Sequence, residues 1–358
     1  MEQQQKNPAL HGRGTAANPP NRFERIEYLP ILDPEADPTS PVKTQFLKDA
    51  SRSLLTTNDS PDVGFDASIN PYRGCEHGCI YCYARPYHEY LGFSAGLDFE
   101  TRILVKENAP QLLREELASP KWQPKVVAIS GVTDAYQPIE RRLRLTRQCL
   151  EVLAEFRNPV IIITKNQLVT RDIDVLCELA GFNATMVCVS VTTLDADLAR
   201  VMEPRTSTPA NRLEAIKALS DAGVPVRVLV APIIPALTDH EVPSIIQAAV
   251  DAGAEYAGYT VVRLPYGVSE LFEGWLEEHF PDRKKKVLNR IRDIRGGRLN
   301  DPNFGTRMRG EGVFAEQIRS MFQLACRRSG VKLGARELSI SEFRRPDEAQ
   351  LSLFSEIR

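Results

Sequence analysis

The chain has 358 residues, of which 42% are hydrophobic and 26% charged, with a formal net charge of −2. This composition supports a full globular core of one large domain or two average ones, and it excludes strongly basic proteins that hold nucleic acid through their overall field. No run of about 18 apolar residues is present, which excludes a transmembrane helix, and no apolar secretory signal opens the chain, so we expect a cytoplasmic protein with no membrane partner.

Residues 1–62 are rich in Pro, Asn and Asp, which predicts an extended, partly ordered N-terminal arm. From residue 63 to 265, apolar β-branched runs alternate with stretches of helical spacing, which predicts βαβ units and a parallel sheet. The expected strands lie within 63–70, 125–132, 159–165, 185–193, 224–235 and 256–265, and the expected helices near 107–118, 138–157, 170–180, 208–222 and 238–252.

Six such units fit an α/β core of the partial (β/α)6 type, a TIM-like barrel left open on one side. A doubly wound open sheet stays as the alternative. In both architectures the chemistry gathers at the carboxyl ends of the strands, and a cysteine-rich loop follows the first strand.

Residues 266–330 predict a C-terminal helical extension, whose basic run Arg283–Lys286 is typical of a solvated helix face. Residues 331–358 form a polar tail. Near its end, a short motif resembles the peptide by which bacterial polymerases and repair proteins dock on the DNA sliding clamp. In that interpretation the clamp-binding residues are Gln350, Leu351, Leu353 and Phe354; the alternative is that this segment packs on the barrel.

Three of the seven cysteines lie within eight residues, as Cys75-x3-Cys79-x2-Cys82. A cytosolic chain keeps its thiols reduced, so this group indicates metal binding before it indicates disulfides. Three thiolates on a four-iron cluster leave one iron open to a small ligand. Structural zinc requires four ligands, and His77 or His88 would have to supply the fourth. The remaining cysteines lie in apolar periodic stretches and are expected to be buried: Cys149, Cys177, Cys188 and Cys326.

The spacing Cys-x3-Cys-x-aromatic-Cys, with Tyr81 in the aromatic position and a strand just before it, resembles the signature of the radical S-adenosylmethionine (SAM) superfamily. The resemblance implies that Cys75, Cys79 and Cys82 hold a [4Fe–4S] cluster whose open iron binds SAM. It also implies cleavage of SAM to a 5′-deoxyadenosyl radical that takes hydrogen from a substrate, and an electron donor such as flavodoxin or ferredoxin.

More narrowly, the chain resembles the spore photoproduct lyase-related (DNA repair photolyase-like) branch, through residues 70–75, 81–86, 130–134, 164–165 and Ser190. The resemblance implies that Lys165 faces the SAM carboxylate and Ser190 the ribose, and it places Thr133 and Asp134 near the amino group.

Ser130 completes this implied cofactor site, and Tyr81 and Tyr83 form the implied catalytic pair. One position departs from the branch, because Val132 stands where the lyase has a hydrogen-donor cysteine. The lyase reaction itself is therefore not predicted.

Glu203, Arg205 and Arg263 are expected near the barrel mouth, either as contacts to substrate or as surface ion pairs. Three hypotheses of function follow. The first is a radical SAM enzyme acting on nucleic acid, in DNA repair. The second is a radical SAM enzyme acting on a small molecule or a protein. The third is a non-catalytic Fe–S or zinc module that recruits partners.

Overall fold

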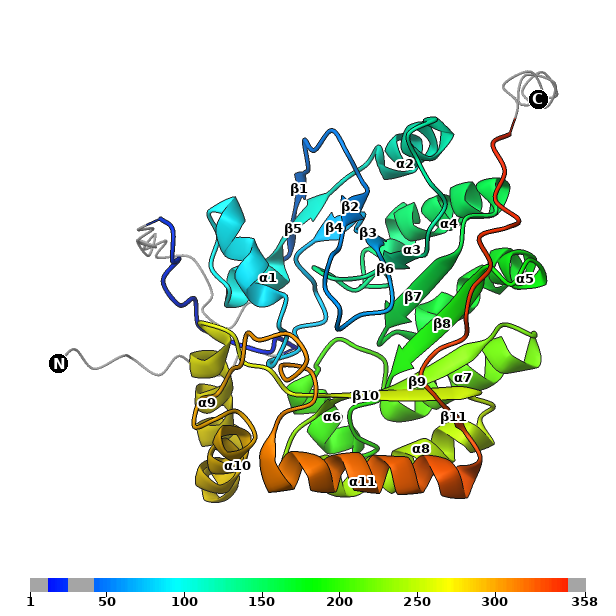
Figure 1. The fold of residues 1–358 in the computed structure, drawn as a ribbon. Coiled ribbons are helices and arrows are strands. Elements are labelled where there is room, and N and C mark those ends of the chain that lie inside the picture. Colours follow the sequence, from blue (N-terminus) through cyan, green and yellow to red (C-terminus); the bar gives the residue numbers. More distant parts are fainter. Residues whose placement is uncertain (1–11, 25–41, 347–358) are drawn as a thin grey trace.

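The computed structural model describes residues 12–24 and 42–346, and its centre is a curved parallel sheet (Figure 1). Six parallel strands occur in chain order across it: β3 (Ala67–Ile69), β6 (Val127–Ile129), β7 (Val160–Thr164), β8 (Thr185–Ser190), β9 (Val226–Ile233) and β10 (Tyr256–Val261). A doubly wound sheet would reverse its strand order part-way across, so the unbroken order confirms the partial (β/α)6 architecture. β2 (Thr56–Thr57) and β11 (Lys332–Leu333) form the two edges, and the described strands do not close into a barrel.

Helices cover the outer face of the sheet and bury the main apolar core against it (Figure 1). They are α2 (Ala109–Ala118), α4 (Leu145–Phe156), α5 (Ile173–Gly181), α7 (Pro209–Asp221), α8 (Val242–Asp251) and α11 (Gly312–Ser329). Local sequence explains their ends. The Thr208 hydroxyl accepts the Asn211 N–H at the start of α7, and Gly223 takes a left-handed conformation just past its end.

The prediction of one helix over 138–157 is wrong, because the chain forms α3 (Glu140–Leu143) and α4 with a break at Arg144 (φ 52°). The buried carboxylate of Glu140 accepts the backbone N–H of Thr146 and the hydroxyl of Tyr72. The break therefore lets a buried acid cap the start of α4.

A second, three-stranded sheet was not predicted. It consists of β1 (Gln45–Lys48), β5 (Arg102–Val105) and β4 (Tyr72–Arg73), in the order β1-β5-β4. Thus part of the predicted N-terminal arm is a strand, paired in parallel with residues some 57 positions later. Beside this sheet lie the 3-10 helix η1 (Arg85–Leu91) and α1 (Leu97–Thr101).

The C-terminal region contains the predicted helices α9 (Val268–His279) and α10 (Pro281–Asp293), which share an apolar cluster with α6 (Ala196–Met202). The basic run on α10 is mostly exposed, as predicted. After β11 the chain crosses the amino ends of the strands, where Ser339 donates to Asn183 and Arg344 to Phe156 (Figure 1, red). Among the described helices, none has the length and apolar character needed to cross a membrane. The clamp-like motif at 350–354 lies outside the described residues.

Candidate active site

The cysteine loop leaves β4 and lies at the carboxyl edge of the large sheet. Cys75 and Cys79 are 6% and 8% exposed, Cys82 is half-buried, and all three are free thiols. Gly74 and Gly78 turn the loop with φ of 80° and 69°, a region that L side chains rarely adopt. These turns keep the three thiols of one short loop close enough to interact electrostatically.

Burial raises the pKa of Cys79 well above its usual value and that of Cys82 to about 11, while the positive charge of Lys165 acts in the opposite sense on both. The thiols of Cys79 and Cys82 are therefore neutral near pH 7, and binding a metal there would release protons. The two histidines considered as a fourth zinc ligand differ in their surroundings. His77 lies against Cys75, Asp134 and Asn166, whereas the His88 ring packs against two phenylalanines. In the described part of the chain, no three His, Cys, Asp or Glu side chains converge on one metal ion.

Arg85 anchors the cysteine loop from inside the protein. Its guanidinium is fully buried, donates twice to the Cys79 carbonyl at 3.0 and 3.1 Å, and pairs with Glu100 at 2.6 Å. Two more of its donated bonds reach the carbonyls of residues 95 and 96. One buried cation thereby ties the loop to the start of α1.

The N-terminal segment 12–24 closes over the same loop. Gly14 donates its N–H to the second carboxylate oxygen of Glu100 at 2.9 Å, and Arg13 donates to the Glu100 carbonyl. Gly14 lies so close to the Gly78 carbonyl that a Cβ would overlap it. The predicted arm thus includes a strap that touches the cysteine loop between Cys75 and Cys79.

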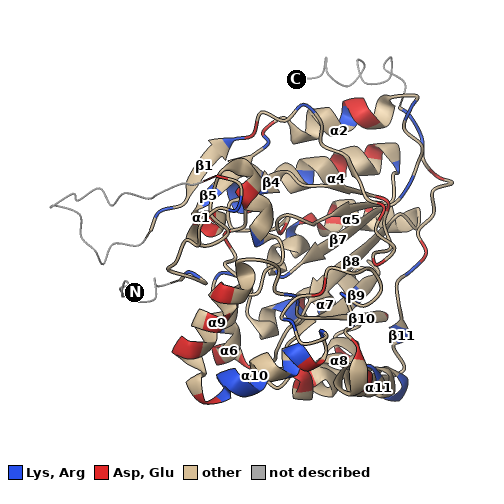
Figure 2. Cartoon of the chain, turned by 60° about the vertical axis from the view of Figure 1, so that its left-hand side comes forward, with Lys and Arg blue, Asp and Glu red and all other residues tan. Residues whose placement is uncertain are grey.

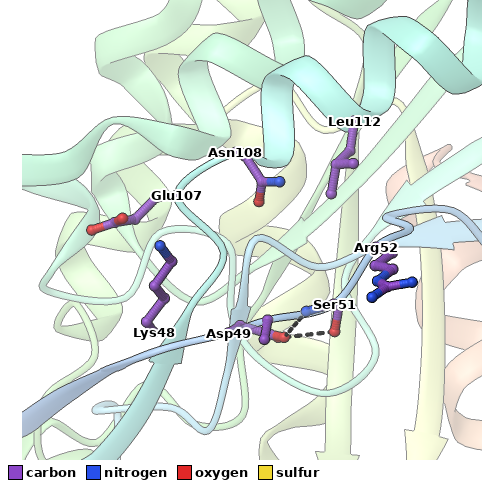
Figure 3. A pocket seen from close by; sticks show the side chains of 8 residues that line it. Lys48, Asp49, Ser51, Arg52, Glu107, Asn108 and Leu112 are labelled. Atoms are coloured by element: carbon purple, nitrogen blue, oxygen red, sulfur yellow. Dashed lines mark hydrogen bonds between the residues drawn. The ribbon is translucent and has the colours of Figure 1, made fainter.

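Residues that line a pocket beside β1 hold the start of the loop from another direction (Figure 3). Its wall includes Asp49 and Ser51, which hydrogen-bond to each other and hold Arg73, two residues before Cys75, by a 3.0 Å ion pair and a 2.5 Å hydrogen bond. Lys48, Arg52 and the start of α2 form the rest of the wall, and none of the predicted site residues lines it.

Asp134, at the end of β6, connects three parts of the site. Its carboxylate accepts from the Thr164 hydroxyl at 2.7 Å and the Lys165 N–H at 2.8 Å, and lies 3.4 Å from His77 Nδ1. Although burial alone would raise its pKa, His77 and the hydrogen bonds from Thr164 and Tyr136 hold it at about 2. Asp134 therefore joins the ends of β6 and β7 to the cysteine loop as a carboxylate.

The orientation of His77 follows from Asn166. The Asn166 Oδ1 already accepts from Leu168 and Ser207, so its amide nitrogen faces His77 Nε2 at 3.0 Å as a donor. Burial alone would lower the pKa of His77, but Asp134 and Cys75 raise it to about 10, so Nδ1 carries a proton toward Asp134.

Thr133 also has a protein partner, because its hydroxyl donates to the Gly74 carbonyl at 2.6 Å. Val132, at the position of the missing donor cysteine, and Ser130 are half-buried beside it. Thr133 and Asp134 thus contact the cysteine loop, and the Val132 N–H donates to Asn70.

Glu203 forms a buried polar centre on the other side of the loop. Its carboxylate, 2% exposed for the residue, accepts from Tyr81, Thr192 and Arg212, and lies 3.9 Å from Lys165 Nζ. Burial alone would raise its pKa, but Arg212 and Lys165 hold it at about 2. The expectation that Glu203 contacts substrate is not supported by this environment, since its oxygens already have protein donors.

The remaining predicted residues differ in accessibility. Ser190 is buried at the end of β8, and Arg205 pairs with Glu76 of the cysteine loop at 3.1 Å. Tyr83 is 43% exposed, and the Arg263 guanidinium lies 5.0 Å from its ring centroid. Of the two tyrosines, Tyr81 is held inside the protein and Tyr83 faces outward.

The structure therefore brings the predicted residues of this site to one edge of the sheet. Sequence reasoning missed the side chains that position them. Each of these is buried and hydrogen-bonds to a residue elsewhere in the chain: Arg85, Glu100, Asn166, Thr192 and Arg212. A signal for one of them was present, because Arg85 stands within the motif that follows Cys82.

Comparison with known proteins gives matches of three kinds: a family model, relatives in sequence and a solved structure. A family model described as the Radical SAM superfamily matches residues 69–249. An uncharacterised protein of Mycobacterium bovis is 37% identical over 250 residues, covering 68% of this chain and 72% of that protein. An uncharacterised protein of Methanocaldococcus jannaschii is 29% identical over 248 residues, covering 69% and 88%. Among solved structures, a spore photoproduct lyase mutant with bound AdoMet and dinucleoside spore photoproduct superposes with a TM-score of 0.60 and 15% identity over 80% of each chain, a likeness of fold.

Proposed function

Because this chain belongs to the radical SAM superfamily, we propose that Cys75, Cys79 and Cys82 hold a [4Fe–4S] cluster and that the protein is an enzyme that cleaves SAM. When bound and reduced, the cluster supplies the electron that breaks a carbon–sulfur bond of SAM, and the resulting 5′-deoxyadenosyl radical abstracts hydrogen from a substrate. The observation that carries the proposal is the buried loop with three thiols at the carboxyl edge of the parallel sheet.

Lys165 and Ser190 are the proposed contacts to SAM. Lys165 lies at the end of β7 with its side chain 14% exposed, and its ammonium donates one hydrogen bond, to the Ala231 carbonyl at 3.0 Å. Its ammonium also lies 3.9 Å from Glu203, and it keeps a proton free for a second carboxylate. Ser190, at the end of the next strand, would meet the ribose, and Ser130 completes this cofactor site.

Thr133 and Asp134, proposed near the SAM amino group, have a second role. Their present partners are Gly74 and His77, on either side of Cys75. We expect them to hold the cysteine loop in register with the ends of β6 and β7 whether or not SAM is bound.

Tyr81 and Tyr83 are the proposed catalytic pair, and we propose a different role for each. The Tyr81 hydroxyl donates to Glu203, which keeps its proton and its ring in place. Tyr83 is exposed beside Cys82 and is the one that can reach a substrate. Because Val132 replaces the donor cysteine, Tyr83 is the proposed hydrogen donor to a substrate radical.

For the substrate we propose nucleic acid, with a role in DNA repair. The fold likeness to a lyase crystallised with a dinucleoside photoproduct supports this class. A small molecule or a protein is the competing substrate. The non-catalytic alternative is an Fe–S or zinc module, and the measurement of 5′-deoxyadenosine distinguishes it from an enzyme.

The test is anaerobic reconstitution with iron and sulfide, reduction, addition of SAM, and chromatographic measurement of 5′-deoxyadenosine. Wild-type protein should bind about four irons and form 5′-deoxyadenosine. Cys79→Ala should lose both, and the matched variant Cys177→Ala, on the half-buried cysteine of α5, should keep both. A wild-type protein with an intact cluster that forms no 5′-deoxyadenosine would refute the enzyme proposal, and tightly bound zinc in aerobic preparations would favour the module.

A further inference from the structure

Exposed aromatic side chains gather on one surface beside the cysteine loop. The described residues contain seven strongly exposed aromatic side chains, and all but Phe46 belong to this group. We call it the aromatic ledge; it consists of Phe23, Tyr83, Tyr87, Tyr90, Tyr266 and Phe304, which are 43–67% exposed. Single exposed apolar residues need no explanation, but a cluster of them indicates a binding surface.

Ring and cation contacts join four residues of the ledge, and Tyr87 interacts electrostatically with Tyr83 beside them. Phe23 stacks on Tyr90 with ring centroids 4.7 Å apart, and Tyr90 lies 6.4 Å from Tyr87 on the same side of η1. Arg22 lies over the Tyr266 ring at 3.6 Å and over Phe23 at 4.9 Å.

The ledge begins at the active site. Tyr83 directly follows Cys82, and Arg263, which lies over its ring, follows β10 at the carboxyl edge of the sheet. The positive charge of Arg307 acts to lower the pKa values of both Tyr83 and Arg263, and its guanidinium lies over the Phe304 ring at 4.3 Å. A molecule bound along these rings would therefore reach the mouth of the barrel.

The charges on the ledge leave one cation without a counter-ion. Arg22 pairs with Glu89 at 2.7 Å and Arg307 with Asp62. Arg263, by contrast, makes no direct ion pair among the described residues. Burial lowers its pKa, and the charge of Asp62, which pairs with Arg307, acts in the opposite sense. Basic and acidic residues intermingle over this side of the molecule (Figure 2), so no broad positive field is present. A single phosphate would supply the missing counter-ion.

We propose that the aromatic ledge binds single-stranded nucleic acid, with bases stacked on its tyrosines and one phosphate on Arg263. This inference rests on the proposed function, because it assigns the ledge to presenting a strand to the active site. Every base has a π-face and stacks on aromatic rings without sequence preference. Among the described residues, the exposed large apolar side chains of the ledge are all aromatic, which favours flat ligands over the mixed apolar surface of a protein partner.

The experiment measures fluorescence anisotropy of 5′-fluorescein-labelled oligothymidylate of fifteen nucleotides, the matching oligouridylate, and a duplex of the same length, each titrated with anaerobic holoprotein. Single strands should bind and the duplex should bind at least about tenfold more weakly. Since stacking contributes about 1–3 kcal/mol per base, Tyr87→Ala and Tyr90→Ala should each weaken binding about fivefold or more. Phe46→Ala, an exposed ring of β1 outside the ledge, is the matched control and should change binding less than twofold.

Salt dependence gives an independent readout. One phosphate contact on a single strand predicts a slope of about −0.7 for log K against log salt, and Arg263→Gln should flatten it. A comparison of the DNA and RNA strands then identifies the source of the bound strand. Equal affinity for duplex and single strand, a slope of several units, or unchanged binding by the double variant Tyr87→Ala/Tyr90→Ala with an unaltered melting temperature would overturn the proposal.

Failure of this proposal is distinguishable from failure of the enzyme proposal. Binding is measured without reductant or SAM, so protein that cleaves SAM but does not bind single strands would refute the ledge alone. Protein that binds single strands but forms no 5′-deoxyadenosine would support the ledge and refute the enzyme.

Discussion

Replacing Arg85 with methionine tests whether a buried ion pair holds the cysteine loop. Arg85 and Glu100 are both fully buried, and their 2.6 Å pair is joined by four bonds from Arg85 to backbone carbonyls. Methionine fills a similar volume but leaves the Glu100 carboxylate with the Gly14 N–H as its remaining donor. Removing one partner of a buried pair costs about 3–5 kcal/mol.

The expected change in melting temperature follows from the size of the chain. An unfolding entropy of about 2.1 cal/mol/K per residue gives about 0.75 kcal/mol/K for the whole protein. The loss should therefore lower the midpoint by about 4–7 °C if the chain unfolds as one unit. The measurement is calorimetry or urea unfolding of the metal-free, reduced protein, so that cluster binding does not contribute.

Two further variants sharpen this test. Adding Glu100→Gln to Arg85→Met removes the unpaired charge and should restore at least about 1 kcal/mol, because neighbouring changes are not additive. Arg200→Met is the surface control, since the Arg200 side chain is 73% exposed and its ion pair with Asp197 contributes little. A loss below about 1 kcal/mol for Arg85→Met, or strict additivity in the double variant, would contradict the assigned anchoring role.

Three other predictions follow from contacts around the same loop. Glu203→Gln leaves a buried arginine unpaired and should lower the free energy of unfolding by about 3–5 kcal/mol at neutral pH, measured by urea unfolding. The folded state holds the Glu203 pKa at about 2, so the stabilisation from this carboxylate is complete above its unfolded pKa near 4.5 and fades as pH falls toward 2. An equal loss of stability in acid for the variant and the wild type would contradict this assignment. Gly14→Val should push the strap off the Gly78 carbonyl and speed proteolysis within residues 12–24, and unchanged proteolysis would show that the strap is not held there. A peptide of residues 346–358 should bind a bacterial sliding clamp at micromolar concentration by calorimetry, and equal binding after Phe354→Ala would refute the motif.

The core of the fold was predictable because its strands carry their own signal. The runs that became β7, β8 and β9 are nearly continuous in apolar residues, as strands covered on both faces must be. The small sheet was not predictable in this way. β1 and β5 have four residues each and pair across a long chain separation, so neither shows enough alternation to identify it.

The residues of the candidate site also fall into a predictable group and an unpredictable one. The thiols and the polar residues at strand ends were identified from local spacing and from position in a βα unit. The groups that position them were missed, because a buried arginine or glutamate in the sequence looks the same as an exposed one. Arg212 illustrates this: it lies on a helix face that is otherwise ordinary, and its burial follows from Glu203 nine residues earlier.

The ion pairs around the cysteine loop suggest why so much charge is buried there. The loop is short and contains two glycines in left-handed conformations. Ile80 and Tyr81 pack into the apolar cluster shared with α6 and α9. In addition, Arg85, Arg205 and Asp134 each fix the loop by directed bonds to a different element. Buried ion pairs add little net stability compared with apolar packing, but they fix geometry. A site that must hold three thiols in one arrangement benefits from fixed geometry more than from stability, so substitutions in this shell should displace the thiols before they unfold the barrel.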